Sequence, residues 1–226
     1  AIYIRKNSTI YNNTIKSGSD YGISLETNDS AYSEISYNTI EDNNADGIFV
    51  LNTHHIQIFG NTIDDNEDYG IYLYNSDFIQ IKNNEITDND GGIQFYLADS
   101  SNVTGNTIDG NGGKGIWFRN SNDNYIKDTE STDSSDDDLE LDDSKRNIGF
   151  NFTFENIDVD TNSDFRITSL LKIRFVNGSG EPFGGVEMEL FNFDHVSFAT
   201  PFYSGSDSVS NSAGYIPREL VVAYKV

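Results

Sequence analysis

Apolar and polar positions follow one another along this chain in a pattern that returns every 22 to 25 residues. Three apolar columns carry the pattern, and each keeps a fixed place relative to the other two. The first column is the isoleucine of an Asn-Thr-Ile or Asn-Glu-Ile motif, at Ile15, Ile40, Ile63, Ile86 and Ile108. The second column lies five residues earlier, at Ile10, Ile35, Ile58, Ile81 and Val103. The third belongs to a Gly-Ile motif, at Ile23, Ile48, Ile71, Ile93 and Ile116. Columns that share one period indicate successive coils of chain stacked on one another.

Each coil is predicted to contain three short strands. After each Gly-Ile motif, apolar residues occupy every second position, as Ile71 and Leu73 do, and a period of two is typical of a strand whose apolar side chains point inward. Clusters of Asn, Asp and Gly separate the strands and indicate turns. We therefore expect an all-β chain with a right-handed parallel β-helix of about six coils over residues 1–156. The asparagines of the motif are expected to form a structural ladder of side-chain amides from coil to coil.

The repeat fades after Ile126, and Ser131 to Asp138 is predicted to be a polar, acidic loop. The period is lost from about Phe165 onward, where alternating apolar residues are separated by turns that contain Gly and Pro. That pattern is typical of a small β-sandwich. The expected organisation is a β-helix over residues 1–156, a linker over 157–164 and a β-sandwich over 165–226.

Two resemblances agree with this organisation. The β-helix region resembles the pectate-lyase-like parallel β-helix repeats, of the variety found in nitrous-oxide-reductase-type periplasmic maturation proteins and in surface proteins, through its Asn-Thr-Ile and Gly-Ile-x-Leu matches. That family contains lyases, hydrolases, epimerases, adhesins and assembly factors, so the resemblance implies a fold but no single activity. The C-terminal region is similar to carboxypeptidase-regulatory or bacterial immunoglobulin-like modules, through Val176 to Pro182 and Ser212 to Tyr215. Such a module implies a spacer or binding appendage on a surface protein.

The charge and composition narrow the classes of partner. Acidic residues outnumber basic ones by 37 to 14, and the formal net charge is −23. A nucleic-acid partner is therefore not expected, because phosphate binding needs a basic face. The absence of cysteine excludes disulfides and thiolate sites. No apolar run is long enough to span a bilayer, and the chain opens within a predicted strand, so we expect a mature or excised piece of an extracellular or cell-surface protein. Strands at both ends also suggest head-to-tail assembly of subunits.

The side chains between the inward positions of each Gly-Ile strand are expected to point outward. Aromatic residues and one arginine gather there: Phe49, Tyr72, Tyr74, Tyr96, Trp117 and Arg119. A contiguous apolar stripe on a surface usually marks an interface. Aromatic platforms flanked by carboxylates also suit sugar rings. The sequence therefore leaves two partners open for this face, a protein subunit or a polysaccharide.

Acidic residues recur in the turns beside these strands. Parallel coils lie about 4.8 Å apart, so like charges stack closely and a hard cation between them would relieve their repulsion. Calcium prefers such oxygen ligands. The candidate Ca²⁺ ligands are Asp42, Asp65, Asp68, Asp88 and Asp90. A simply solvated acidic edge is the alternative interpretation, and no other cofactor is expected.

Catalysis is the last question that the sequence raises. The lyases that the chain resembles use calcium-binding carboxylates with an Arg or Lys base, and Arg119 is the best candidate base, with Glu140 and Asp142 one coil further on. The Asp-Pro-His signature of the related epimerases is missing after both Tyr-Gly pairs, at Tyr21 and Tyr69. We therefore expect a non-catalytic extracellular protein with a structural or adhesive role, which presents the aromatic face and acidic edge to protein or glycan. The alternative is a polysaccharide-active enzyme, a Ca²⁺-dependent lyase or a glycoside hydrolase.

Overall fold

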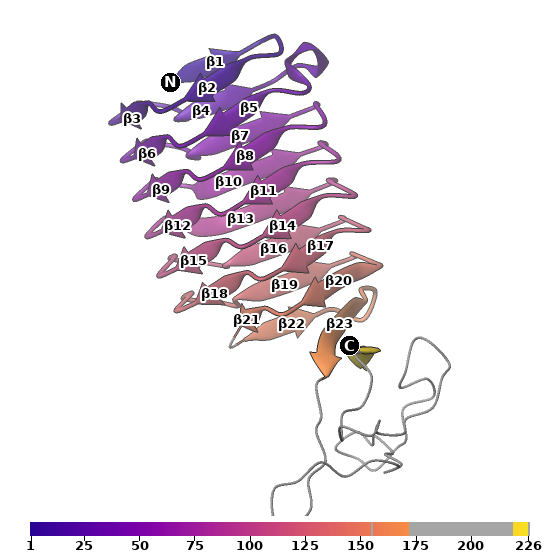
Figure 1. Cartoon of the computed structure of the whole chain (residues 1–226). Helices are drawn as coiled ribbons and strands as arrows, with labels where there is room; N and C mark the ends of the chain where they lie inside the picture. The colour runs from indigo at the N-terminus through magenta and orange to yellow at the C-terminus, as the bar shows by residue number, and fades with distance from the viewer. Residues whose placement is uncertain (155, 172–218, 226) are drawn as a thin grey trace, which may run out of the picture. The chain divides into compact units, whose positions relative to one another are not determined.

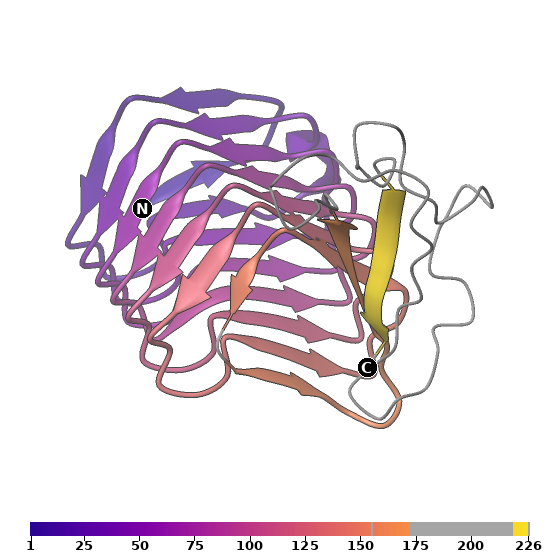
Figure 2. The same ribbon diagram turned by 60° about the horizontal axis from the view of Figure 1, so that its bottom comes forward.

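The computed structural model describes residues 1–154, 156–171 and 219–225. These residues divide into two compact units, the first from Ala1 to Phe165 and the second from Arg166 to Lys225. The first unit is a parallel β-helix in which the chain winds through three sheets in turn (Figure 1). A view turned toward the axis shows each coil lying in front of the one before it (Figure 2). The helix makes about seven turns, since one of its three sheets is built of seven strands, one from each turn.

Every coil contributes one strand to each sheet. Sheet A contains β1 (Ile2–Ile4), β4 (Ile23–Leu25), β7 (Ile48–Leu51), β10 (Tyr69–Tyr74), β13 (Gly91–Tyr96), β16 (Ile116–Arg119), β19 (Leu139–Asp142) and β22 (Ile157–Val159). Within the first unit, sheet B contains β2 (Thr9–Tyr11), β5 (Glu34–Ser36), β8 (Gln57–Phe59), β11 (Gln80–Lys82), β14 (Asn102–Thr104), β17 (Tyr125–Lys127) and β20 (Asn147–Phe150). Sheet C contains β3 (Thr14–Lys16), β6 (Thr39–Glu41), β9 (Thr62–Asp64), β12 (Glu85–Thr87), β15 (Thr107–Asp109), β18 (Glu130–Thr132) and β21 (Thr153–Phe154).

The three predicted apolar columns form the core. In sheet A, Ile48 pairs with Ile71 and Ile71 with Ile93, and all three side chains are fully buried. Burial of one such side chain stabilises the fold by roughly 1.5–3 kcal/mol relative to leaving it exposed. The same apolar residue type therefore repeats at each coil because each coil must cover the core of its neighbours.

The expected amide ladder is present between sheets B and C. The side-chain oxygen of Asn61 accepts hydrogen bonds from the backbone N–H and the side-chain amide of Asn38, at 2.9 and 3.0 Å. Asn61 in turn donates to Asn84 at 3.0 Å and to the carbonyl of Ile35 at 2.9 Å. A second ladder runs through Asn43, Asn66, Asn89 and Asn111. Because these buried amides satisfy one another, the ladders hold adjacent coils in register.

The number of coils was predicted as about six, and the structure has about seven because coil geometry outlasts the sequence motif. Thr129 takes the place of the ladder asparagine and Ser131 the place of the motif isoleucine, since Ser131 pairs with Ile108 in sheet C. Ser131 therefore lies in strand β18, so the polar segment predicted as a loop from Ser131 begins after Thr132. Residues 157–164, expected as a linker, contribute β22, which pairs with β19 and closes the first unit.

The second unit contains two described strands, β23 (Phe165–Leu171) and β24 (Glu219–Lys225), which pair antiparallel. β23 begins at Phe165, the last residue of the first unit. Most of the β-sandwich predicted over residues 165–226 falls on residues 172–218, which lie outside the described residues, so the sandwich stays a prediction. The described residues contain one short 3-10 helix (Asn28–Ser30), and no helix among them is long and apolar enough to cross a membrane.

Candidate functional site

The outward face of sheet A carries a continuous row of aromatic rings. Because side chains alternate across a strand, the residues between the buried Ile and Leu positions point away from the core. The register brings them side by side: Phe49 pairs with Tyr72, and Tyr74 pairs with Tyr96. Ring centroids lie 5.5 Å apart for Phe49 and Tyr72, 6.4 Å for Tyr72 and Tyr74, and 5.2 Å for Tyr74 and Tyr96. These spacings fall in the range for interacting aromatic pairs.

The row ends in a cation placed between two rings. The guanidinium of Arg119 lies 4.9 Å from the ring centre of Tyr96 and 5.5 Å from that of Trp117. The indole N–H of Trp117 donates to Asp142 at 3.0 Å, which fixes the indole plane. All six residues predicted for this face therefore lie together on four adjacent strands, β7, β10, β13 and β16. The five aromatic side chains are half-buried, while Arg119 is exposed.

Two further tyrosines extend the row, and the sequence prediction did not include them. Tyr21 stacks on Phe49 with ring centres 4.6 Å apart, and Tyr69 lies 5.9 Å from Tyr72. The ring of Tyr69 covers Gly91 on the next coil, where an added Cβ would come within 2.4 Å of the ring. Both tyrosines stand directly before a Gly-Ile motif, one residue outside the outward positions that the two-residue period gives, so the alternation alone does not find them.

A carboxylic acid lies among these rings. Asp46 occupies the same position of its coil as Tyr21 and Tyr69, directly before Gly47, and its side chain is only 4% exposed. One oxygen accepts a hydrogen bond from the backbone N–H of Tyr69 at 2.9 Å. Burial raises the pKa of Asp46 to about 7, because the hydrogen bond offsets only part of the lost hydration. A carboxyl group that titrates near neutral pH can exchange a proton with a bound ligand.

The pKa values of the tyrosines beside Asp46 are also raised. Burial, together with the carboxylates of Asp90 and Asp46, raises the pKa of Tyr69 to about 12. Burial likewise raises the pKa of Tyr72, and the Asp46 carboxylate adds to the effect. Both phenols are therefore protonated hydrogen-bond donors at neutral pH.

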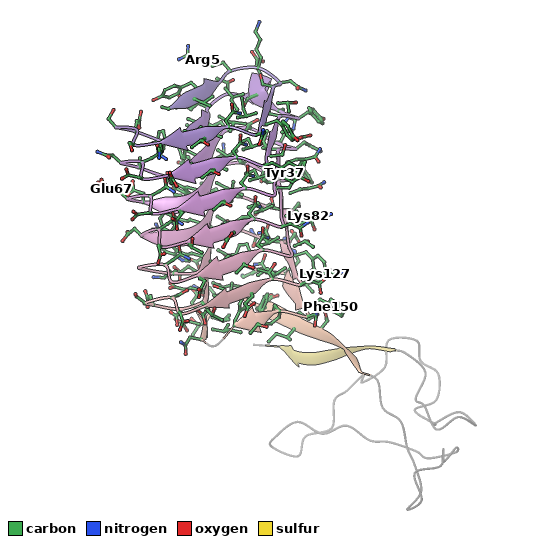
Figure 3. The ribbon with its side chains drawn as sticks, turned by 60° about the vertical axis from the view of Figure 1, so that its left-hand side comes forward. Arg5, Tyr37, Glu67, Lys82, Lys127 and Phe150 are labelled. Carbon is green, nitrogen blue, oxygen red and sulfur yellow. The ribbon has the colours of Figure 1, made fainter. Side chains whose placement is uncertain are left out.

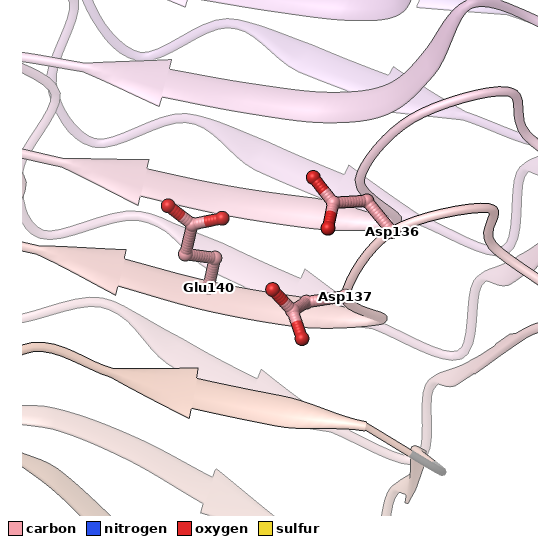
Figure 4. Close-up of side chains that lie close together, drawn as sticks. All are labelled: Asp136, Asp137 and Glu140. Atoms are coloured by element: carbon pink, nitrogen blue, oxygen red, sulfur yellow. The ribbon is translucent and has the colours of Figure 1, made fainter.

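A cluster of charged side chains lies at the other end of the row, on β19 and in the turns that precede β16 and β19. The ammonium of Lys114 contacts carboxylates of Asp136 and Glu140, each at 2.9 Å, and lies 4.8 Å from the ring centre of Trp117. Asp136, Asp137 and Glu140 each offer a carboxylate oxygen within 4.8 Å of the others (Figure 4). Burial and the neighbouring Asp136 raise the pKa of Asp137. Lys114 already supplies positive charge to this cluster, and the sequence prediction named only Glu140 from it.

Comparison with known proteins assigns the fold to a family. A family model described as a right handed beta helix region matches residues 1–78 and 28–164. The chain belongs to this family. No curated protein matches the chain. The finer resemblances, to pectate-lyase-like repeats and to an immunoglobulin-like module, stay predictions.

Solved structures with the β-helix fold include tailspikes and an epimerase. Tailspike protein 2 of the Escherichia coli bacteriophage CAB120 matches with a TM-score of 0.60 and 12% identity, over 80% of this chain and 28% of its own. The Dettilon tailspike protein matches with a TM-score of 0.56 and 14% identity, over 85% of this chain and 48% of its own. The periplasmic alginate epimerase AlgG matches with a TM-score of 0.55 and 17% identity, over 74% of this chain and 51% of its own. At these identities the likeness shows the fold alone, and the chain spans at most about half of each relative.

The predicted calcium ligands lie in the turns that lead from sheet C to sheet A. Asp42, Asp65 and Asp88 follow sheet C and have positive φ angles of 55°, 51° and 53°. Asp68 and Asp90 follow three and two residues after these turns, and all five are exposed. Among the described residues, the one group of three acidic side chains close enough to share an ion is Asp136, Asp137 and Glu140. The structure does not bring the five aspartates into such a group, and calcium binding there stays a prediction.

The structure brings Arg119 only partly together with Glu140 and Asp142, the acidic residues considered with it as a catalytic group. Arg119 pairs with Asp142 in the sheet register, and Trp117 pairs with Glu140. The Asp142 carboxylate accepts from the indole of Trp117, and that of Glu140 contacts Lys114. These carboxylates therefore hold the neighbours of Arg119 rather than Arg119 itself. The carboxyl group with the most perturbed environment on this face is Asp46, three strands away.

Proposed function

We propose that this β-helix protein is a non-catalytic polysaccharide-binding protein of the extracellular space or cell surface, and that the aromatic face of sheet A holds the glycan. The observation that carries the proposal is the row of rings from Tyr21 to Tyr96, which the guanidinium of Arg119 continues to Trp117. Parallel strands lie about 4.8 Å apart, so the three spacings between β7 and β16 alone give a platform about 14 Å long. An extended apolar platform with polar groups beside it suits a chain of sugar rings.

The polar groups on the platform fit a hydroxyl-rich ligand. Arg119 is exposed and makes no ion pair among the described residues, so its N–H groups are free to donate to sugar oxygens. Its stacking on Tyr96 holds the guanidinium in one plane. The alginate epimerase that shares this fold supports a polysaccharide over a protein subunit as the partner.

Affinity electrophoresis through gels that contain one polysaccharide each tests this proposal. The panel would include alginate, polygalacturonate and a neutral glucan. We expect Trp117→Ala to weaken binding by at least about tenfold, as for the aromatic residues that dominate the binding energy of an interface. Tyr32→Ala is the matched control, since Tyr32 is an exposed tyrosine that lies outside sheet A. Equal retardation of both variants on every gel would refute the proposed face.

A polysaccharide-active enzyme is the second candidate, and one observation favours it. Asp46 places a buried carboxyl group with a pKa of about 7 among the rings of the same face. Groups tuned toward neutral pH are typical of general acids and bases. The test is release of reducing ends or unsaturated products from the polysaccharide panel. Product release that Asp46→Asn abolishes without loss of binding would establish the enzyme and overturn the non-catalytic assignment.

Contact with protein subunits and head-to-tail assembly stay predictions. Light scattering across a wide range of protein concentrations measures the second directly. A mass that rises steadily with concentration supports assembly, whereas a constant monomer mass contradicts it.

A further inference from the structure

A pocket of about 300 Å³ opens on the outward face of sheet B, away from the aromatic row of sheet A. Its walls come from β8 and β11 and from the turns that follow β5 and β11: Tyr37, Gln57, Phe59, Gln80, Lys82 and Asn83. Tyr37 and Lys82 follow one another down one side of the helix (Figure 3). The volume is at the lower end of the range for small-molecule sites, so it has room for one or two sugar rings.

Tyr37 is the unusual residue of this pocket. It lies in the turn from sheet B to sheet C with a φ of 55°, a left-handed conformation that bulky residues rarely adopt. The equivalent position in the other coils holds only asparagine, aspartate or glycine: Asn12, Gly60, Asn83, Gly105, Asp128 and Asn151. At this position of the coil, the chain therefore accepts the strain of a left-handed bulky residue only at Tyr37, although Tyr32 and Phe78 have positive φ angles at another position. Such strain is a reason to look for function.

The residues around Tyr37 hold its ring in place with one face open to solvent. The ring lies against Gly60 of the next coil, where an added Cβ would come within 2.9 Å of it. Phe59 meets it edge-on at 5.4 Å between ring centres. The Tyr37 side chain is nevertheless 56% exposed. One face of the pocket is thus an ordered aromatic ring open to solvent.

The polar side chains of the pocket have unused hydrogen-bonding capacity. The amides of Gln57 and Gln80 and the ammonium of Lys82 are exposed and have no side-chain partner among the described residues. No carboxylate lines the pocket, although the chain carries 37 acidic residues. The neighbouring acid of the same row, Glu34 on β5, accepts a hydrogen bond from Ser36 at 2.7 Å. Lys82 is therefore a local positive charge beside neutral donors and acceptors.

We propose that this pocket binds a sugar unit that carries a carboxylate, with the sugar ring against Tyr37 and the carboxylate at Lys82. The ammonium supplies a charge-assisted hydrogen bond. Gln57 and Gln80 offer both donors and acceptors, which match the mixed hydroxyls of a sugar. The proposal is independent of the sheet A face, because the two sites share no residue.

The test uses the complete chain and a short probe, digalacturonate, with cellobiose as the neutral comparison. Binding is followed by ligand-observed NMR titration. Tyr37→Asn is expected to weaken digalacturonate binding by at least about tenfold. Asparagine suits the left-handed turn, so this variant should fold. Tyr32→Asn is the matched control, because Tyr32 has a φ of 63°, is 61% exposed and does not line the pocket.

Lys82→Gln tests the charge in the proposal. We expect it to lower the affinity for digalacturonate toward that for cellobiose, and to remove most of the salt dependence of binding. Trp117→Ala, which alters only the sheet A face, should leave digalacturonate binding at this site unchanged even if it abolishes glycan binding at the sheet A face. Equal affinity of wild type and Tyr37→Asn would overturn the site, and equal affinity of wild type for the two sugars would overturn the carboxylate preference.

Discussion

Replacing Asp46 by asparagine should stabilise the protein above neutral pH. The carboxyl group is nearly inaccessible, lies among the rings of Tyr21 and Tyr69, and has a folded-state pKa of about 7 against an ordinary value of 3.8. Its pKa is raised on folding, so folding disfavours the ionised form. The group's stabilising effect is complete below pH 3.8 and is lost as the pH rises toward 7.

The size of this stability change follows from the difference between the two pKa values of Asp46, 3.8 and about 7. Each pH unit corresponds to about 1.4 kcal/mol, so ionising Asp46 in the folded state removes about 4 kcal/mol of stability by pH 8. Asparagine keeps the acceptor oxygen for the Tyr69 N–H and carries no charge at any pH. The variant should therefore gain up to about 4 kcal/mol over wild type at pH 8 relative to their difference at pH 4.

Urea unfolding followed by circular dichroism at pH 4, 6 and 8 measures this difference. Comparing Asp46→Asn with wild type at each pH cancels the contribution of the other acidic groups. Asp88→Asn is a suitable control, because Asp88 is exposed and lies in a turn where asparagine is equally suited to positive φ. A gap between Asp46→Asn and wild type that does not widen from pH 4 to pH 8 would show that the carboxyl is ionised and well solvated in the folded protein.

Two further predictions concern the stacking of the coils, and urea unfolding checks both. Asn61→Ala should cost about 2–4 kcal/mol, because it leaves buried groups of both adjacent coils without partners; Asn44→Ala, which removes an exposed amide outside the ladders, should change stability by less than about 0.5 kcal/mol. Gly47→Ala should cost about 1–3 kcal/mol, because its Cβ would lie 2.6 Å from Ile63 and 2.7 Å from the carbonyl of Gly70. Gly112→Ala, whose nearest contact is 3.6 Å, is its control. Similar losses in a variant and its control would contradict the packing argument.

The fold could be predicted because every coil repeats the same pattern of apolar positions. Each repeat places an isoleucine at the same three points, and a coil that lost one would open the core to its neighbours. The outward row was predictable for the same reason, since the residue between two buried positions of a strand must face solvent. The number of coils could not be predicted exactly. Thr129 and Ser131 keep the hydrogen bonds and the register of the Asn-Thr-Ile motif, although neither residue matches the motif in sequence. Backbone pairing between parallel coils does not depend on the side chain.

The pocket on sheet B shows a different limit. Tyr37 follows an ordinary strand, and nothing in its local sequence indicates a left-handed backbone for a tyrosine. The signal is in the column, where other coils hold asparagine, aspartate or glycine. Only the alignment of one coil with the next makes Tyr37 an exception. Lys82 and Gln57 are separated by 25 residues, so the register alone brings them to one pocket.

Asp46 shows how one residue of turn length decides the chemistry of the aromatic face. In sequence it belongs with Asp20, Asp68 and Asp90, the acids that precede a Gly-Ile motif. Those three stand two residues before the glycine of their Gly-Ile motif, whereas Asp46 stands directly before Gly47, the glycine of its own motif. This shift of one gives Asp46 the coil position of Tyr21 and Tyr69. There its carboxyl group is buried and accepts a hydrogen bond from the backbone N–H of Tyr69. Burial then changes an ordinary solvated acid into the group on this face that titrates near neutral pH. Counting positions from the glycine, rather than grouping residues by charge, is what separates the two kinds of aspartate.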